Sequence, residues 1–386
     1  MNAGWKTVKL GDVARYDKAQ GIHSGLPYVG LEHIESGTRK FIGSRSDMEV
    51  HSSTFLFNPN HVLYGRLRPY LRKVLVPDFA GHCSTEIFPI LPSDDLDRSY
   101  LSYWLITEST TGAIDRLCNG ARMPRANMEQ ALELEIPLPP LAEQKRIVAL
   151  LDEAFAGIDE AKAKAECNNQ ASADLLESRL SELFLKPEET PSMISDHCTD
   201  VTVGYVGPMA DKYVPNGIPF LRSQNVRPFE INFDNLMQIT PGFEKSLAKS
   251  RLAPGDVVVV RTGYPGTAAV IPTELPMANC ADLVILRPMK SLDPNYLVAF
   301  FNSKVGKDMV LGRLVGAAQK HFNVGAAKSV LLPIPTIQRQ REVVSHISEI
   351  RTHIGKLMDN SEIKLSELSE LKASTLAQAF AGELTA

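Results

Sequence analysis

Two stretches of the chain, each running from a proline-rich segment into a helix, decide the fold. The first is Ile136-Pro137-Leu138-Pro139-Pro140-Leu141-Ala142-Glu143-Gln144-Lys145-Arg146-Ile147, and the second is Leu332-Pro333-Ile334-Pro335-Thr336-Ile337-Gln338-Arg339-Gln340-Arg341-Glu342-Val343. Proline can neither donate to a hydrogen-bond ladder nor extend a helix interior, so each proline segment predicts a hinge between two elements. A long stretch without proline follows each hinge. The chain therefore contains the same junction twice.

The two junctions belong to a longer internal repeat. The offset that carries Gln144 onto Gln340 also carries other residues of the first half onto identical residues of the second. These pairs include Val62 and Val258, Pro69 and Pro265, Pro92 and Pro288, Tyr100 and Tyr296, Gly120 and Gly316, and Asn127 and Asn323. A repeat of this length indicates a duplicated domain.

Each copy begins with short β-like runs that are separated by turn residues, and a shorter helix follows. The expected strands are Pro27–Leu31, His61–Tyr64, Ile87–Leu91, Pro219–Leu221, Val257–Val260 and Leu283–Leu286. The expected short helices are Asp97–Thr107 and Pro294–Gly306.

After each hinge, apolar residues recur at alternating steps of four and three, which is typical of a helix that packs against another helix. In the first helix they are Ile147, Leu151, Ala154, Ile158, Ala161, Ala165, Leu175, Leu180 and Leu183. In the second they are Val343, Ile347, Ile350, Ile354, Leu357, Leu365, Leu368 and Leu371. We expect all of them in the core, and we expect Lys186-Pro187 to end the first helix.

These patterns predict an α+β fold with an approximate twofold internal repeat. Two similar β-rich domains, residues 1–140 and 187–336, are joined by two long antiparallel coiled-coil helices, residues 141–186 and 337–386.

Composition excludes several classes of protein. The chain has 386 residues, of which 44% are hydrophobic and 22% charged, as in ordinary globular proteins. Its apolar runs are strand-sized, and its N-terminus has no apolar targeting core, so we expect no membrane association and a cytoplasmic location. Its five cysteines lie far apart, which argues against a disulfide framework or a zinc site.

The net charge of −4 by itself argues mildly against a nucleic-acid partner. Most of the acidity, however, lies in the two helical stretches. Basic clusters remain in the domains: Arg66, Arg68, Arg72 and Lys73 in the first, and Lys304, Lys307, Arg313 and Lys320 in the second. A basic face on a near-neutral domain is sufficient for contact with phosphates, although ordinary solvated charge is an equal alternative for any one cluster.

Two similar domains on a fixed spacer suit a ligand with two sites at fixed separation, and duplex DNA is the commonest such ligand. Because the two copies differ in most residues outside the repeat framework, we expect the two half-sites to differ in sequence.

The chain also resembles the specificity subunits of type I restriction–modification enzymes over essentially its whole length. The two junctions carry this resemblance, together with Leu176-Glu-Ser-Arg-Leu-Ser-Glu-Leu-Phe184, Ile218-Pro-Phe-Leu-Arg-Ser-Gln-Asn-Val226 and Leu376-Ala-Gln-Ala-Phe-Ala-Gly-Glu-Leu384. The second junction departs from the first by placing Arg339 at the position of Glu143.

The resemblance implies a subunit that reads a split, asymmetric double-stranded DNA sequence. Two methyltransferase subunits would dock on the helices and transfer a methyl group from S-adenosylmethionine to adenine N6, and a restriction and translocase subunit would join for cleavage. The cofactor would be bound by the partner. The junction residues Glu143, Gln144, Arg146, Gln340 and Arg341 are our candidates for binding these partners.

The sequence agrees with a reader that has no chemistry of its own. It contains no phosphate loop of the G-x-x-x-x-G-K-[ST] type and no glycine-rich nucleotide fingerprint. Asn58-Pro59-Asn60-His61 is not the Asn-Pro-Pro-aromatic motif expected of an adenine methylase. We therefore expect no catalytic residue, no metal and no cofactor in this chain.

Three loops in each domain are candidates for reading DNA, because arginine suits guanine and Gln or Asn suits adenine. The first loop holds Glu32 and His33 in copy one and Arg222, Ser223, Gln224 and Asn225 in copy two. The second holds Arg66, Arg68, Tyr70, Arg72 and Lys73, matched by Arg261, Thr262 and Tyr264. The third holds Arg122 and Arg125, matched by Gln319, Lys320 and His321.

A phosphate contact or a plain surface charge is an open alternative for each of these arginines. Asn127 and Asn323 are predicted to be turn or cap residues rather than base contacts. Two other functions stay open: a duplicated, non-catalytic ligand-binding scaffold on a coiled coil, and a self-contained DNA-modifying enzyme, which the missing motifs disfavour.

Overall fold

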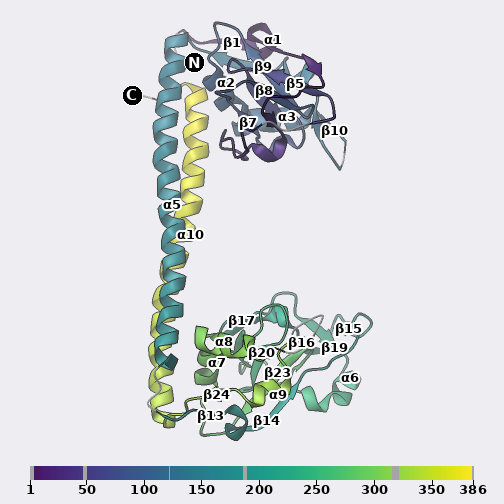
Figure 1. Ribbon diagram of the computed structural model, residues 1–386, viewed down its shortest axis with the longest axis vertical. Coiled ribbons are helices and arrows are strands. Elements are labelled where there is room, and N and C mark those ends of the chain that lie inside the picture. Colours follow the sequence, from purple (N-terminus) through teal and green to yellow (C-terminus); the bar gives the residue numbers. More distant parts are fainter. Residues whose placement is uncertain (1–3, 47–49, 121, 186–188, 315–320, 385–386) are drawn as a thin grey trace. The chain divides into compact units, whose positions relative to one another are not determined.

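The computed structural model describes residues 4–46, 50–120, 122–185, 189–314 and 321–384. The chain forms two compact units, Met1–Ala165 with Glu362–Ala386, and Glu166–Ser361. The unit boundaries fall inside the two long helices, α5 (Leu141–Leu185) and α10 (Ile337–Ala381). Each unit therefore consists of one β-rich domain and a segment of both helices (Figure 1).

The first unit contains two four-stranded sheets, ordered β2-β9-β6-β7 and β3-β5-β8-β4, and two small two-stranded sheets. All neighbours are antiparallel except β4 and β8. The strands are β1 (Lys6–Lys9), β2 (Ala14–Tyr16), β3 (Gln20–Gly21), β4 (Tyr28–Val29), β5 (Thr54–Phe57), β6 (Val62–Gly65), β7 (Val74–Leu75), β8 (Gly81–Ser84), β9 (Ile87–Pro92), β10 (Cys118–Asn119), β11 (Arg125–Ala126) and β12 (Glu135–Leu138). The shorter helices are α1 (Leu10–Val13), η1 (Leu31–His33), η2 (Pro69–Leu71), α2 (Arg98–Leu105), α3 (Glu108–Arg116) and α4 (Met128–Ala131).

The second unit repeats the first of these sheets as β14-β23-β20-β21, whereas its other four-stranded sheet is ordered β15-β19-β16-β22, with β16 between its antiparallel and its parallel neighbour. Its strands are β13 (Ser192–Met193), β14 (Cys198–Val203), β15 (Tyr213–Val214), β16 (Ile218–Leu221), β17 (Val226–Arg227), β18 (Glu230–Ile231), β19 (Met237–Ile239), β20 (Val257–Val260), β21 (Ala268–Val270), β22 (Asn279–Cys280), β23 (Leu283–Pro288) and β24 (Leu331–Leu332). Its shorter helices are η3 (Ile194–His197), η4 (Ser223–Asn225), α6 (Pro241–Ser246), η5 (Ala248–Ser250), α7 (Pro294–Asn302), α8 (Lys304–Leu311) and α9 (Val324–Lys328).

The duplication predicted from the sequence is confirmed by the elements themselves. The offset that carries Gln144 onto Gln340 also carries β9 onto β23 and α5 onto α10, with identical limits in both cases. In both units a parallel strand pair, β4 with β8 and β16 with β22, interrupts otherwise antiparallel sheets. The predicted α+β class with long helices is therefore observed.

A buried glutamine joins each domain to the start of its long helix. The Gln144 Nε2 donates to the carbonyl oxygens of Asp95 (2.8 Å) and Pro139 (2.9 Å), while its Oε1 accepts from the Asp97 amide (2.8 Å). Gln340 makes the same three bonds at 2.7–2.9 Å, to Ser291, Pro335 and Asp293. Both side chains are fully buried. Our assignment of Gln144 and Gln340 to partner binding is therefore wrong, because both side chains are inaccessible and bond to backbone groups of their own chain.

The aspartates at these contacts also begin the next helices. The Asp97 carboxylate accepts from the amides of Ser99 and Tyr100, and Asp293 does the same at the start of α7. A side-chain oxygen in this position satisfies amides that have no partner inside the helix. One three-way contact thus fixes the hinge, the long helix and the short helix together.

The proline hinges differ from our expectation. Residues Glu135–Leu138 form strand β12, which pairs with β1 and places Pro137 opposite Thr7. In the second copy the matching strand β24 ends before Pro333 and pairs with β13. A proline is compatible with a two-stranded sheet because its missing N–H can face away from the partner strand.

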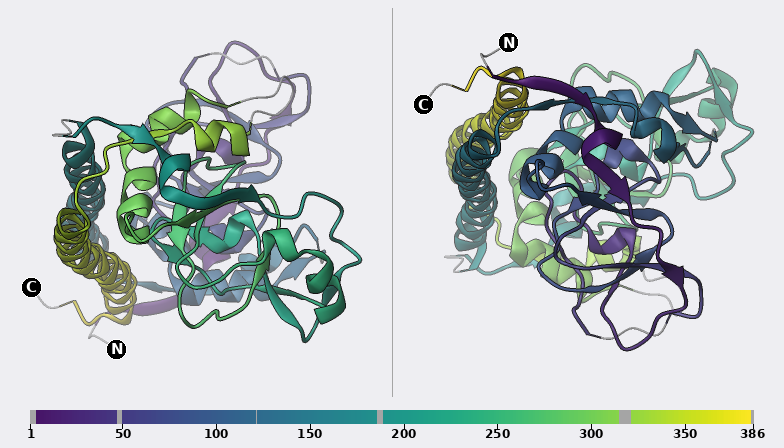
Figure 2. Two further views of the ribbon diagram at one scale, coloured as in Figure 1. Left: turned by 90° about the horizontal axis from the view of Figure 1, so that it is seen from below. Right: turned by 90° about the horizontal axis from the view of Figure 1, so that it is seen from above.

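In the first unit, the beginning of α5 and the end of α10 lie side by side and antiparallel (Figures 1 and 2). Asp159 of α5 bonds to Lys372 of α10, and Arg146 bonds to the carbonyl of Leu384, so the two segments run in opposite directions. Ile147, Leu151, Phe155, Ile158, Leu376 and Ala379 enter the core of the first domain.

In the second unit, Leu180 and Phe184 of α5 share a core with Val343 and Ile347 of α10. The ends of the two helices make matching aromatic contacts: Phe380 packs on Tyr100 in the first unit, and Phe184 packs on Tyr296 in the second. These phenylalanines belong to two of the sequence segments that carry the family resemblance.

Not every apolar position of the predicted helix seam is buried. Leu175, Leu357 and Leu371 are about half exposed, which corrects our expectation that they lie in the core. A straight helix drifts relative to a repeat of 3.5 residues, so a strict four-three spacing moves off the contact face over several turns. In the described part of the chain, no helix is both long enough and apolar enough to cross a membrane.

The glutamine contact leads to a stability prediction. Gln144→Ala leaves an amide and two carbonyl groups without partners in a buried site, so we expect the free energy of unfolding to fall by about 2–4 kcal/mol. Gln340→Ala should have a similar effect on the second unit. Chemical denaturation of the purified chain measures both changes.

Gln338→Ala serves as the control, because this side chain lies on the first turn of α10 and is exposed. It should change stability by less than about 0.5 kcal/mol. Equal effects of the exposed and buried substitutions would contradict the structural role of the glutamines.

Candidate nucleic-acid interface

In the first domain, the predicted second loop is a turn that follows β6. Arg68 and Arg72 flank η2 and both adopt left-handed backbone conformations, with φ of 53° and 50°. Arg68 and Tyr70 are exposed, and Tyr70 retains 52% of its accessible surface. No described residue bonds to the side chain of Arg68, which is therefore available to a ligand.

The structure brings the predicted third loop against this turn. The Arg68 amide donates to the Pro124 carbonyl (2.8 Å), and Leu67 forms a bridge with Arg125. Between them lies an open cavity of about 530 Å³, whose basic lining residues are Lys18, Arg66 and Arg125. Arg122 is exposed on the hairpin that joins β10 to β11. The second and third loops thus form one surface.

Three cations of this surface are held by the protein itself. The Lys73 Nζ donates to the carbonyls of Leu31 (2.6 Å) and Ile34 (2.9 Å), so it ties the first loop to the second. The Arg125 Nε donates to Glu86 at 2.9 Å, and the Arg66 Nε lies 3.8 Å from the same carboxylate. Lys73 is therefore a positioning residue rather than a DNA contact, because its ammonium group already has two carbonyl partners.

In the second domain, the first and second predicted loops frame a larger cavity of about 680 Å³. Ser223 and Gln224 of η4 line one side, and Thr262 and Tyr264 line another. Tyr264 is 82% exposed and Gln224 is exposed as well. The structure thus brings four of the predicted reading residues of this domain together.

Other candidates of the second domain are structural. Asn225 is fully buried, and its Nδ2 donates to the carbonyls of Asn232 and Asp234. Arg261 donates to the Phe322 carbonyl (3.0 Å) and pairs with Asp282, which leaves its side chain only 11% exposed. The structure therefore corrects their assignment as DNA contacts.

Arg222 is intermediate between these cases, because its Nη2 donates to the Asn235 carbonyl (2.8 Å) while its side chain is partly exposed. His321 is half-buried next to Phe322, whose amide donates to Arg261. Gln319 and Lys320 lie outside the described residues.

The structure confirms the predicted role of two asparagines and adds residues that the sequence patterns missed. The side chains of Asn127 and Asn323 accept from amides at the first turns of α4 and α9, as predicted. Lys18 lines the first cavity and Arg227 the second, although neither belongs to a motif or to a basic cluster in the sequence. Chain folding places Lys18 beside the reading loops, whereas Arg227 already lies two residues after Asn225 in the sequence.

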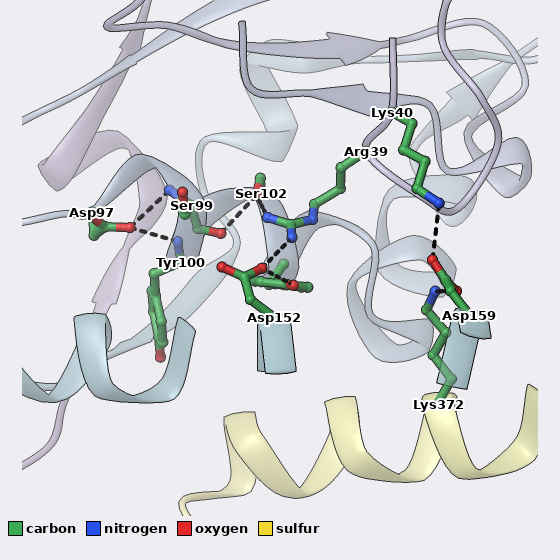
Figure 3. Close-up of polar contacts among 10 residues, drawn as sticks. Arg39, Lys40, Asp97, Ser99, Tyr100, Ser102, Asp152, Asp159 and Lys372 are labelled. Carbon is green, nitrogen blue, oxygen red and sulfur yellow. Dashed lines mark hydrogen bonds and ion pairs between the residues drawn. The ribbon is translucent and has the colours of Figure 1, made fainter. Parts of the chain in front are cut away.

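A network of charged residues anchors the first domain to the helices (Figure 3). The guanidinium of Arg39 donates to Ser102 (3.0 Å) and Asp152 (2.9 Å) and lies 3.4 Å from the centre of the Tyr103 ring. One residue further on, the Lys40 Nζ donates to Asp159 of α5 (3.0 Å).

Asp159 joins three segments of the first unit. Its second oxygen accepts from Lys372 of α10 (3.1 Å), so Asp159 holds both Lys40 and Lys372. Burial opposes the ionisation of Asp159, but the hydrogen bonds from the two lysines outweigh this effect and hold the pKa of that carboxyl below its usual value. Through the Gly37 amide, which donates to the Arg72 carbonyl (3.1 Å), the same loop also contacts the reading turn.

The remaining partner-binding candidates lie near the starts of α5 and α10. Glu143 and Arg146 form an ion pair with two hydrogen bonds of 2.8 Å, which lowers the pKa of the glutamate. Arg341 is exposed, and no described residue bonds to its side chain. Among the described residues no group of His, Cys, Asp and Glu could hold a metal ion.

Comparisons with known proteins agree on one family. Residues 2–167 match the family model of the "Type I restriction modification DNA specificity domain". The chain is similar to the specificity subunit of the type I restriction enzyme EcoDI of Escherichia coli, with 30% identity over 204 residues, which cover 50% of this chain and 45% of the relative. It is 24% identical over 279 residues to that of EcoBI, also of Escherichia coli, covering 65% of this chain and 58% of the relative.

The chain thus spans about half the length of these two curated relatives. A solved structure described as "Structural basis underlying complex assembly and conformational transition of the type I R-M system" contains a similar chain, with a TM-score of 0.85 and 22% identity. That similarity covers 100% of this chain and 99% of the other, so the fold is shared over its full length.

The Asp159 contact leads to a prediction about pH. Since the folded-state pKa is lower than the unfolded value of about 3.9, its stabilising effect is present above that pH and is lost as the pH falls through the folded-state pKa. We expect Asp159→Asn to lower the free energy of unfolding by at most about 1 kcal/mol at pH 7, because the carboxylate is partly exposed. Denaturation at pH 7 and at successively lower pH measures the difference.

Asp359→Asn, at an exposed aspartate of α10, is the matched control and should have no effect at either pH. The difference between wild type and Asp159→Asn should vanish in acid. A difference that stays constant with pH would show that Asp159 does not act through its charge.

Proposed function

Because the chain belongs to the family of type I restriction–modification DNA specificity subunits, we propose that it selects the DNA sequence on which such a complex acts. Each domain reads one part of a bipartite, asymmetric target in double-stranded DNA. The chain itself carries no catalytic step.

The observation that carries this proposal is the pairing of one fold with two different reading surfaces. The first domain presents Arg68, Arg122 and Tyr70, whereas the second presents Gln224 and Tyr264. Arginine forks suit guanine or phosphate, and glutamine suits adenine. Two domains of the same fold that expose different side chains suit a DNA target whose two parts differ in sequence.

The partners follow from the same proposal. Two methyltransferase subunits dock on the helices and carry S-adenosylmethionine for adenine N6 methylation, and restriction and translocase subunits join them in the cytoplasm. The exposed apolar residues Leu357, Ile363 and Leu371 of α10 support docking there, since apolar side chains exposed on a helix favour contact with another protein. Arg341, Glu143 and Arg146 add polar groups near the helix starts.

A first experiment measures DNA binding and its dependence on salt. We expect Arg68→Gln and Arg122→Gln each to weaken binding. If the arginine contacts a phosphate, the salt slope of the logarithm of affinity should fall by about 0.9; if it contacts a base, discrimination should drop by about 1–3 kcal/mol.

Arg179→Gln, at an exposed arginine of α5, is the control and should leave both quantities unchanged. Wild-type affinity that does not depend on salt would exclude DNA as the ligand and favour a small-ligand scaffold instead.

A second experiment exchanges one reader. Replacing residues 1–140 with the corresponding domain of another family member should change one half-site and leave the other intact, because each domain has its own core. Sequencing of modified adenines in cells that express the chimaera with its methyltransferase partner identifies both half-sites. A change in both halves would contradict independent reading.

A further inference from the structure

The cavity of the second domain is lined by both apolar and polar residues. Val226, Val260, Pro265 and Leu311 supply apolar lining, and Gln224 and Thr262 lie among the polar residues of the lining. The turn that bounds it carries Gly263 and Gly266, with φ of 84° and 93°, on either side of Tyr264-Pro265. A Cβ on Gly266 would lie 3.5 Å from Val310 of α8, so the turn rests closely on that helix.

The corresponding turn of the first domain is built differently. There the equivalents of Tyr264 and Gly266 are Arg68 and Tyr70, and residues Pro69–Leu71 form η2, which packs against α3 with Pro69 buried. The cavity between the turn and α8 is therefore a feature in which the two duplicated domains differ. Such a difference is a candidate for specificity rather than for the shared scaffold.

The charges at this cavity favour a polyanion. Lys307 and Arg227 line it, while among the described residues no acidic side chain lines it and none bonds to either cationic group. A long polyanion that carries an exposed apolar group fits both the cationic residues and the apolar lining of the cavity. In the major groove, the thymine 5-methyl group is the apolar projection of the base pairs, and the adenine opposite it presents N6 and N7, which a glutamine side chain recognises.

We propose that this cavity takes the 5-methyl edge of a thymine in the half-site of the second domain, while Gln224 bonds to the adenine of the same base pair. The inference rests on the proposed function and makes it more specific: the second half-site contains an A·T pair read through its methyl group. Tyr264, exposed at the mouth of the cavity, covers the neighbouring surface of the duplex.

The test uses duplexes that carry the target found by adenine sequencing, with each dT in turn replaced by dU, which lacks only the methyl group. The second half-site is the one that stays constant when residues 1–140 are exchanged. At one position in it, dU should weaken binding of the full chain with its methyltransferase partner about fourfold, the factor that corresponds to about 0.8 kcal/mol for one buried carbon group.

Two variants locate the effect in the cavity. Leu311→Asn replaces an apolar lining residue that is 52% exposed, so the fold should tolerate it, and it should bind dT and dU duplexes equally. Leu331→Asn, at a leucine of β24 that is 38% exposed and outside the cavity, should keep the fourfold preference for dT.

The outcomes separate this inference from the proposed function. Sequence-specific binding with no loss at any dU of the second half-site, a second half-site without an A·T pair, or a dT preference that survives Leu311→Asn would each overturn the inference and leave the proposed function standing. Absence of sequence-specific binding by the wild-type complex would overturn both.

Discussion

The rest of the structure depends on one contact, the buried side-chain amide of a glutamine, which occurs once in each unit. Gln144 and Gln340 each bond to three backbone groups that come from the hinge and from the segment before a short helix. A buried amide with all its partners in place is strongly directional, because any shift of the helix leaves polar groups unsatisfied. The direction in which each long helix leaves its domain is set at this point.

The far ends of the helices complete what the glutamines begin. Phe380 packs on Tyr100 in the first unit, and Phe184 packs on Tyr296 in the second. Each domain therefore contacts the start of one long helix and the end of the other. In the first unit, Arg39 and Lys40 add charged contacts to Asp152 and Asp159. In the first unit, the loop that carries Arg39 and Lys40 therefore packs against the helices and also contacts the turn at Arg72.

Around this shared frame the two reading surfaces differ in chemistry. The first gathers arginines around an acidic counter-ion, Glu86, and the second surrounds an apolar cavity with a glutamine and a tyrosine. Several charged residues near both surfaces are used internally, as Lys73 and Arg261 show. Under the proposed function, the exposed side chains can therefore differ between the two domains while the internal pairs keep the loops in place.

The sequence by itself determined the duplication, the two long helices and the caps Asn127 and Asn323, because repeats, apolar periodicity and cap residues act locally along the chain. It could not separate exposed cations from those held by carbonyls or carboxylates, as with Lys73 and Arg261, because their partners are distant in sequence. For the same reason the sequence wrongly assigned Gln144 and Gln340 to partner binding. Both are polar side chains near the start of a helix, and both are fully buried. Which side chains meet, and which are left for a ligand, was decided only by tertiary packing.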